Sequence, residues 1–376
     1  MKWIKTFLII TVSAPLHSAD FGFSLYNKSG YAENIFANYH QLPDAYTRTA
    51  GFVNADWIGA QNGVRLYYEG TWTAFQNYRD RGSLRHAFGL KSYRDLSERG
   101  DNVRGGIEWR RMSYGSGYEW YDAGEFSGFG NVKWVLGPQL YFYSGGSIRR
   151  KSYVHLPPFS HWSGSIYGRA SRFFNSGTTA MLEVDLLFKR YDPDASQRPV
   201  DELPEMVTLG TGTGQQAVVR LRLAQAVTPV TGISLELSRR QVLQSSVRYI
   251  GTGSGIYYSD EELFDDVFGY ESNSLSLEIK QRLPWGMQLQ LGGAVMEKAY
   301  PERLAFDLEG VPYPDGRLRS DNRSSAWISV QRSWSPGAGL PLLKLALDGY
   351  LLNNGSNDPY YHYDSSGLSL GLSFDF

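Results

Sequence analysis

Apolar and polar side chains alternate strictly at the C-terminal end of the chain, and this pattern limits the fold more than any other feature. Apolar side chains occupy every even position of the last nine residues, at Leu368, Leu370, Leu372, Phe374 and Phe376. Because successive residues of a β-strand point to opposite faces, this stretch predicts a strand with one apolar face and one polar face. A water-soluble β-sandwich would rarely end its chain on such a strand.

The same alternation recurs along the whole chain. In residues 180–188, Leu182 and Val184 share one face, and Glu183 and Asp185 share the other. Comparable segments are 219–223, 233–237, 275–280 and 287–291. Such segments, separated by turn residues, are the sequence signature of a transmembrane β-barrel, whose closed sheet satisfies the backbone hydrogen bonds. The mean hydropathy of −0.36 fits this class, because half of each strand would face water.

Sixteen strands are predicted, with fourteen or eighteen as the alternatives. Their ranges are 20–38, 46–58, 63–77, 83–96, 102–114, 122–136, 139–152, 162–174, 178–190, 215–227, 232–245, 272–283, 286–299, 322–334, 341–352 and 363–376. Every second connection is short, as at 175–177 and 228–231. The connections 191–214, 246–271 and 300–321 are long. Short periplasmic turns and longer extracellular loops are typical of membrane barrels, and an even strand count places both chain ends on the periplasmic side.

The N-terminal residues predict an exported protein. Lys2 and Lys5 flank the start of a short apolar run, and a plausible cleavage site ends at Ala19, so residues 1–19 are predicted to be a cleavable signal peptide. The chain contains no cysteine, which excludes disulfides and thiolate chemistry. Without Lys2 and Lys5 the chain has 35 basic and 38 acidic residues, a balance that does not indicate a nucleic-acid partner.

A terminal strand of this kind, ending on Phe376, resembles the closing strand of bacterial outer-membrane β-barrels. The resemblance covers residues 20–376 and implies an all-β, antiparallel, up-and-down transmembrane barrel in the outer membrane. It also implies contacts with membrane lipid and lipopolysaccharide, and with the barrel-assembly machinery that reads the terminal strand. Two short segments, 30–36 and 356–361, resemble the opening strand and the last loop of barrels that export exopolysaccharide or assemble surface proteins. Many of those barrels carry a periplasmic helical-repeat domain, which this chain lacks.

The polar face of the predicted strands carries charges of both signs, and we predict that these side chains line the lumen. They are Arg65, Lys91, Arg104, Glu108, Arg110, Lys133, Arg169, Glu183, Asp185, Arg220, Arg222, Glu236, Glu278, Lys280 and Arg282. A barrel of sixteen strands is wide enough for an aqueous channel unless something fills it. Alternatively, Arg220 and Arg222 pair with Glu183, Asp185 and Glu236, which would keep the wall hydrated and in register.

One long connection, 246–271, is predicted to fold inward as a constriction. Its acidic side chains either bind a divalent cation or belong to a solvated loop; they are Asp260, Glu261, Glu262, Asp265 and Asp266. We favour the solvated loop, because the spacing matches no dedicated calcium loop.

Catalysis is not predicted. His161 and Ser163 resemble the His-x-Ser pair of outer-membrane phospholipases, whose pair lies on the lipid-facing wall. Here Trp162 and Ile166 are predicted to face lipid, which turns His161 and Ser163 inward. No cofactor or metal site is predicted either.

Aromatic residues near the predicted strand ends fit a girdle at the level of the lipid headgroups. The residues are Trp57, Trp72, Trp109, Trp134, Tyr360, Tyr361 and Tyr363. Three functions remain open: a porin-like channel for small polar solutes, an export conduit or assembly factor for polysaccharide or surface protein, and a structural or adhesive barrel with a closed lumen.

Overall fold

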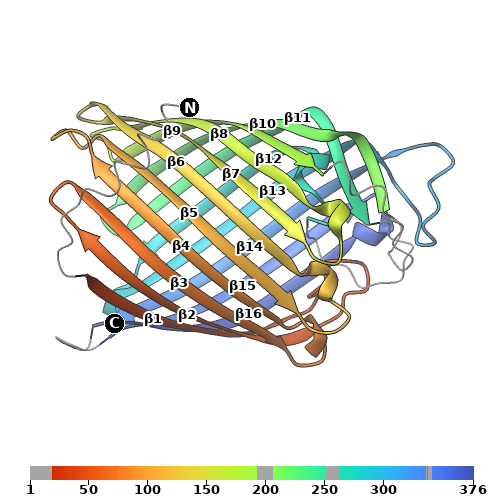
Figure 1. Ribbon diagram of the computed structural model, residues 1–376, viewed down its shortest axis with the longest axis horizontal. Coiled ribbons are helices and arrows are strands. Elements are labelled where there is room, and N and C mark those ends of the chain that lie inside the picture. The colour runs from red at the N-terminus through yellow and green to blue at the C-terminus, as the bar shows by residue number, and fades with distance from the viewer. Residues whose placement is uncertain (1–18, 193–205, 251–261, 336, 338–340) are drawn as a thin grey trace.

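The computed structural model describes residues 19–192, 206–250, 262–335, 337 and 341–376, so the predicted signal peptide lies almost wholly outside the described residues. Sixteen antiparallel strands close into one barrel, in which each strand pairs with the next and β16 pairs with β1 (Figure 1). The strands are β1 (Asp20–Ala32), β2 (Asp44–Ile58), β3 (Asn62–Phe75), β4 (Ser83–Asp95), β5 (Asn102–Tyr114), β6 (Ala123–Gly137), β7 (Leu140–Tyr153), β8 (His161–Phe173), β9 (Thr178–Tyr191), β10 (Met206–Thr228), β11 (Thr231–Ile250), β12 (Glu271–Arg282), β13 (Met287–Leu304), β14 (Leu318–Trp334), β15 (Leu342–Ser356) and β16 (Tyr363–Asp375). The predicted fold class and strand count are confirmed.

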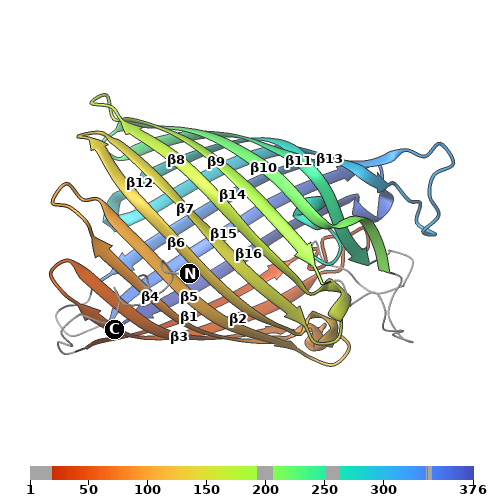
Figure 2. The ribbon, with the colours of Figure 1, turned by 45° about the horizontal axis from the view of Figure 1, so that its top comes forward.

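The two ends of the barrel differ in their connections. Tight turns join β2 to β3, β8 to β9 and β10 to β11 at one end, and the longer connections gather at the other (Figures 1 and 2). We call these the turn end and the loop end. The turn between β12 and β13 depends on Trp285 and Gly286, whose φ angles of 60° and 71° are left-handed and reverse the chain within three residues. The predicted division into short turns and long loops is therefore present.

The hairpin β10–β11 extends beyond its neighbours. Strand β9 pairs with β10 only from Thr213 to Gln225, and β12 pairs with β11 only from Thr231 to Arg240. Beyond these points β10 and β11 pair with each other as far as Met206 and Ile250. This extension was not predicted, because its glycine-rich sequence interrupts the alternation and its register is irregular after Gly210.

The first strand is shorter than predicted. It ends at Ala32 rather than at residue 38, because the following residues form a loop closed by their own hydrogen bonds. The amide of Asn34 donates to the backbone carbonyl of Asn38 at 2.7 Å, and Ala37 has a φ of 50°. A residue with that φ cannot continue a strand.

The outer face of the barrel is apolar. In β9, Leu182, Val184 and Leu186 are 42–52% exposed, as are their counterparts on the other strands. Below the extension of β10 and β11, every strand of the closed sheet has a partner on both sides, and an apolar outer band is what a bilayer requires of such a wall. Within the described part of the chain, no helix is long and apolar enough to cross a membrane.

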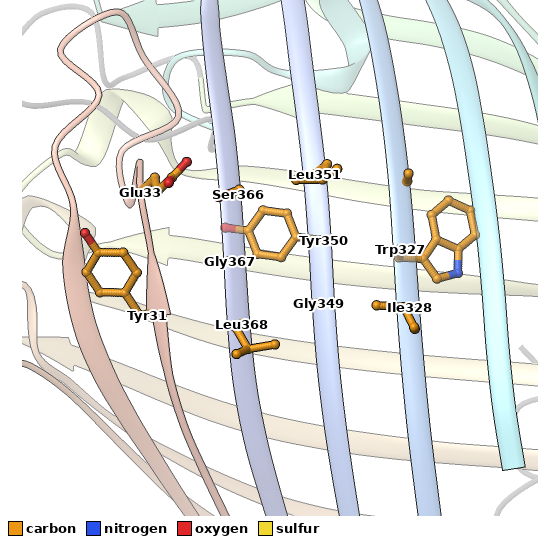
Figure 3. Close-up of a pocket in the computed structure, with 11 residues that line it drawn as sticks. Tyr31, Glu33, Trp327, Ile328, Gly349, Tyr350, Leu351, Ser366, Gly367 and Leu368 are labelled. Carbon is orange, nitrogen blue, oxygen red and sulfur yellow. The ribbon is translucent and has the colours of Figure 1, made fainter.

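A groove of about 440 Å³ interrupts this outer face at the seam where the barrel closes (Figure 3). The register places Tyr31, Leu368, Gly349 and Ile328 in one row across β1, β16, β15 and β14. Gly349 contributes no side chain to the row, and the larger neighbours stand around the gap. The groove faces outward and does not belong to the barrel interior.

Candidate pore and its inner segment

Residues 262–270, which we call the inner segment, cross the interior of the barrel at the loop end. At one side the segment contacts β7, β8 and β9 through Glu262. At the other side it contacts β13 and β14 through Asp265. Strands β7 and β14 are nearly opposite in a closed ring of sixteen, so a segment that contacts both lies inside the ring. The predicted inward fold of connection 246–271 is present in its described part.

Glu262 binds four basic side chains of the wall, which we call the Glu262 cluster. Its carboxylate lies 2.8 Å from Lys189 Nζ, 3.0 Å from Lys151 Nζ, 3.1 Å from His161 Nε2 and 3.3 Å from Arg149 Nη2. Burial favours the neutral carboxyl, but Lys189, His161 and Lys151 outweigh it and hold the pKa of Glu262 well below its usual value. Glu262 is therefore ionised at neutral pH.

Asp266 strengthens the same side of the barrel. It accepts a hydrogen bond from Lys189 Nζ at 2.7 Å and another from the Tyr191 hydroxyl at 2.7 Å. Its second carboxylate oxygen accepts from the backbone N–H of Phe268 and so caps the start of the short η6 turn (Val267–Gly269). Lys189 is only 1% exposed and sits between two carboxylates.

Asp265 occupies the corresponding position on the opposite wall. We call Asp265 and the wall side chains around it the Asp265 cluster. Its carboxylate accepts from Lys298 Nζ at 2.7 Å and from the Tyr300 hydroxyl at 2.5 Å, and it lies 3.3 Å from Arg319 Nη1. Arg319 also binds Asp321 on its own strand at 2.5 Å. All of these side chains are buried. The favoured prediction of a solvated acidic loop is wrong for Glu262, Asp265 and Asp266, because cations of distant strands enclose them.

An apolar cluster covers the inner segment at the loop end. It joins connections that are far apart in the sequence and consists of Ala123, Tyr153, Leu156, Phe159, Ile250, Leu263, Phe264, Tyr360 and Tyr361, with Tyr39, Trp120 and Tyr121 packed against it. Leu263 and Phe264, which are 2% exposed, lie between the two acidic anchors. The inner segment is thus held by charges at both sides and by apolar packing between them.

The contacts of the inner segment show which side of each strand faces the interior. Lys189 faces inward, so Glu183 and Asp185, which share its face of β9, do so as well. The residues predicted to line the lumen lie on the face opposite the outward-facing aliphatic side chains of their strands, and exposed rings such as Phe129 and Tyr93 share this inner face.

Many of these wall charges are paired. Arg220 donates to Glu183 at 2.6 Å and also to Asp185. Further ion pairs within the wall are Arg65–Asp56, Arg110–Glu108, Arg110–Glu125, Arg169–Glu183 and Lys280–Glu278. The alternative role of Arg220 in wall pairing is therefore present. Arg222 instead contacts the Ser234 hydroxyl at 3.5 Å, and no ion pair with Glu236 forms in the described structure.

A group of neighbouring wall cations toward the turn end lacks a carboxylate within 4 Å among the described residues: Lys91, Arg104 and Lys133. They lie on the consecutive strands β4, β5 and β6. Lys91 stands directly opposite Arg65 in the register, and its ammonium lies 4.6 Å from the centre of the Tyr67 ring. A cavity of about 640 Å³ opens beside Arg65, Lys91 and Arg104. Like charges opposite each other destabilise a sheet, so this arrangement needs another reason.

Sequence reasoning missed the wall residues that hold the inner segment, namely Arg149, Lys151, Lys189, Lys298 and Arg319. Each lies at the loop end of a strand whose alternation was recognised in part, and Lys189 continues the pattern of Glu183 and Asp185. Strand β13, which carries Lys298, extends beyond its predicted end at residue 299. Strand β14 begins before its predicted start at residue 322, so Arg319 lay outside the predicted strands.

His161 and Ser163 face the interior, as expected from the exposure of Trp162 and Ile166. Their polar atoms have separate partners. His161 Nδ1 lies 2.8 Å from the carbonyl oxygen of Phe159, and Ser163 Oγ accepts from Arg149 Nε at 3.1 Å.

The aromatic girdle is only partly as predicted. Trp72, Trp109 and Trp134 are 43–52% exposed on the strands. Tyr360, Tyr361 and Tyr363 are at most 5% exposed, so their assignment to the girdle is wrong. Tyr360 and Tyr361 form the η8 turn (Pro359–Tyr361) and belong to the apolar cluster instead.

No known protein family matches this chain, and no curated protein resembles it closely enough in sequence to count as a relative. Solved structures match it over nearly its whole length. They include OccK5 (OpdH) of Pseudomonas aeruginosa, with a TM-score of 0.55, 10% identity, and coverage of 95% of this chain and 98% of that one. The outer membrane protein OpdK of the same organism has a TM-score of 0.51 and 9% identity, with coverage of 95% of this chain and 98% of that one. OpdO, also of this organism, has a TM-score of 0.50 and 11% identity, with coverage of 96% of this chain and 97% of that one. The chain thus has the same overall fold as these Pseudomonas proteins.

Proposed function

We propose that this protein is an outer-membrane channel for small polar solutes. The observation that carries the proposal is the division of one closed barrel into an apolar outer face and a charged inner wall. Such a wall has no purpose in a barrel packed with apolar side chains, whereas sixteen strands leave room for water. The shared fold with the outer membrane protein OpdK supports the location.

The same proposal implies which partners the barrel contacts in the outer membrane. The apolar outer face would contact membrane lipid and lipopolysaccharide. The strand from Leu368 to Phe376 would be the segment that the barrel-assembly machinery recognises. Its partner strand is β1, and the Phe23 and Phe376 rings lie 5.6 Å apart at the seam.

Unpaired cations support a preference for anions. Lys91, Arg104 and Lys133 face the interior without a carboxylate partner among the described residues, whereas most wall acids are neutralised by nearby arginines or lysines. An excess of one charge along a narrow aqueous path concentrates ions of the opposite sign. Arg104 and the two lysines would thus favour anionic over cationic solutes.

Conductance in planar bilayers tests this function. In a KCl gradient, the refolded chain is expected to give a persistent current. Its reversal potential should have the sign of a channel that passes chloride more readily than potassium. The triple variant K91Q/R104Q/K133Q should shift that potential toward zero. Arg317→Gln, which removes an exposed loop cation paired with Asp315, is the control. A cation-selective current, or a triple variant indistinguishable from the control, would contradict the preference for anions.

A second candidate is a structural barrel with a closed lumen. The specific observation in its favour is the apolar cluster that joins several connections across the loop end. The two candidates differ in one measurement, because a closed barrel gives no current at any voltage. Silence of the folded protein, with folding verified by its heat-modifiable gel mobility, would favour the closed barrel.

A further inference from the structure

We propose that the inner segment is an internal latch, in which three carboxylates of the chain occupy two cationic sites on opposite walls and keep the loop end constricted until they are released. This inference rests on the proposed channel function and assigns its regulation. Glu262 and Asp266 occupy the site on β7–β9, and Asp265 occupies the site on β13–β14.

These carboxylates are surrounded by more basic side chains than are needed to hold one loop in place. Glu262 alone faces two lysines, one arginine and one histidine, supplied by three strands. Glu125 of β6 is a further acid close to this site, at 3.7 Å from Arg149. On the opposite wall, Asp321 shares Arg319 with Asp265. The cations therefore stand on the wall as preformed anion sites, and the segment supplies the anions.

Buried ion pairs are a poor way to fix a loop permanently. Removing charges from water costs about as much as their mutual attraction returns, and well-packed apolar side chains of the same size often stabilise a protein more. A charged contact differs from an apolar one because water, salt or a competing ion can replace each partner. The use of five cationic side chains around two anchors therefore favours a contact that opens over a contact that only fills space.

The path between the anchors fits this interpretation. Leu263 and Phe264 lie between Glu262 and Asp265, and the backbone N–H of Ile250 donates to the carbonyl of Leu263 at 2.9 Å. Glu262 and Leu263 also form part of the wall of an interior cavity of about 330 Å³. Release of the two anchors would free the segment from the wall and expose Leu263 to water.

Cysteine accessibility measures the latch directly, since the chain has no cysteine of its own. A single Leu263→Cys change is made in the full chain, refolded into lipid vesicles, and a charged thiosulfonate reagent is added. In the otherwise native barrel, labelling is expected to be slow. In the background E262Q/D265N/D266N it should be faster by at least about tenfold, because removing one partner of a buried ion pair shifts an opening equilibrium by more than one order of magnitude.

Two further variants keep the test decisive. The milder Glu262→Gln change should give an intermediate labelling rate if the triple variant fails to fold. Asp315→Asn, which removes an exposed loop acid paired only with Arg317, should leave the rate unchanged. Equal rates in the native, E262Q and D315N backgrounds would overturn the latch.

Conductance separates the latch from the channel function on which it depends. If the protein conducts, release of the latch should raise the single-channel conductance or the fraction of time spent open. If neither the native protein nor the variants conduct, the channel function fails. The labelling rates then still decide whether the segment is held by its carboxylates.

Discussion

At the scale of single residues, the inner wall combines large rings with glycines that make room for them. Tyr67 lies over Gly89, where a Cβ would overlap its ring, and its hydroxyl donates to Glu108 at 2.6 Å. Gly292 and Trp327 form a similar pair, directly opposite each other in the register of β13 and β14. Neither pair was predicted, because the partners are recognised only once the register is known.

The pair of Tyr67 and Gly89 gives a prediction about stability. Gly89→Ala should destabilise the folded barrel by about 1–3 kcal/mol, the usual cost of excess volume in a packed site. The displaced ring would also lose its hydrogen bond to Glu108. Denaturant titration in lipid vesicles measures the change. Gly51→Ala is the control, because no atom lies within 4 Å of a Cβ built there, and equal effects of both changes would contradict this account.

Glu262 gives a prediction about pH. Its pKa lies below the ordinary value of 4.5, so its ionised form stabilises the anchored segment above that pH. The stabilisation falls as the pH drops through the lowered pKa and is lost below it. Labelling of Leu263→Cys, measured with an acid-tolerant thiol reagent, should therefore accelerate as the pH falls below 4.5 and through the lowered pKa. The Glu262→Gln background should lack this step, and a native barrel without the step would contradict the assignment.

At the scale of elements, the alternation of side chains was sufficient to find every strand but not every strand end. Strands β4 and β5 begin at the predicted residues, because their polar and apolar positions alternate cleanly. The ends of β10 and β11 were missed, because they form a two-stranded extension that has no need of an outer apolar face. The inward fold of the connection 246–271 was expected from its length and charge.

The structure of the inner segment could not be predicted from the sequence in the same way. Acidic residues in a loop ordinarily face water, and the cations that enclose Asp265 and Asp266 lie on strands distant in the sequence. Only the closed ring brings β9 and β13 to the two sides of one segment. The same reason explains Tyr360 and Tyr361, which were expected at the membrane surface and pack instead against other loops.

Strand β9 gives a prediction about the two faces of the wall. Leu182 is 48% exposed on the outer face, and Glu183 follows it on the inner face. Leu182→Arg should destabilise the barrel in a bilayer by about 2–4 kcal/mol, because the charge would face hydrocarbon. Met181→Arg, which places the same charge on the opposite face, should cost less. Refolding equilibria in vesicles measure both, and a reversed order would mean that the faces are exchanged.

At the scale of the whole molecule, the barrel joins its extended hairpin to its interior. The end of β11 is hydrogen-bonded to the inner segment through Ile250 and Leu263, and Val247 and Tyr249 pack with Phe268. The hairpin rises past its neighbours on both sides. Under the proposed channel function, an antibody or phage protein that grips this projecting ribbon would therefore also restrain the segment within, so that a contact made at the surface would change what the barrel admits.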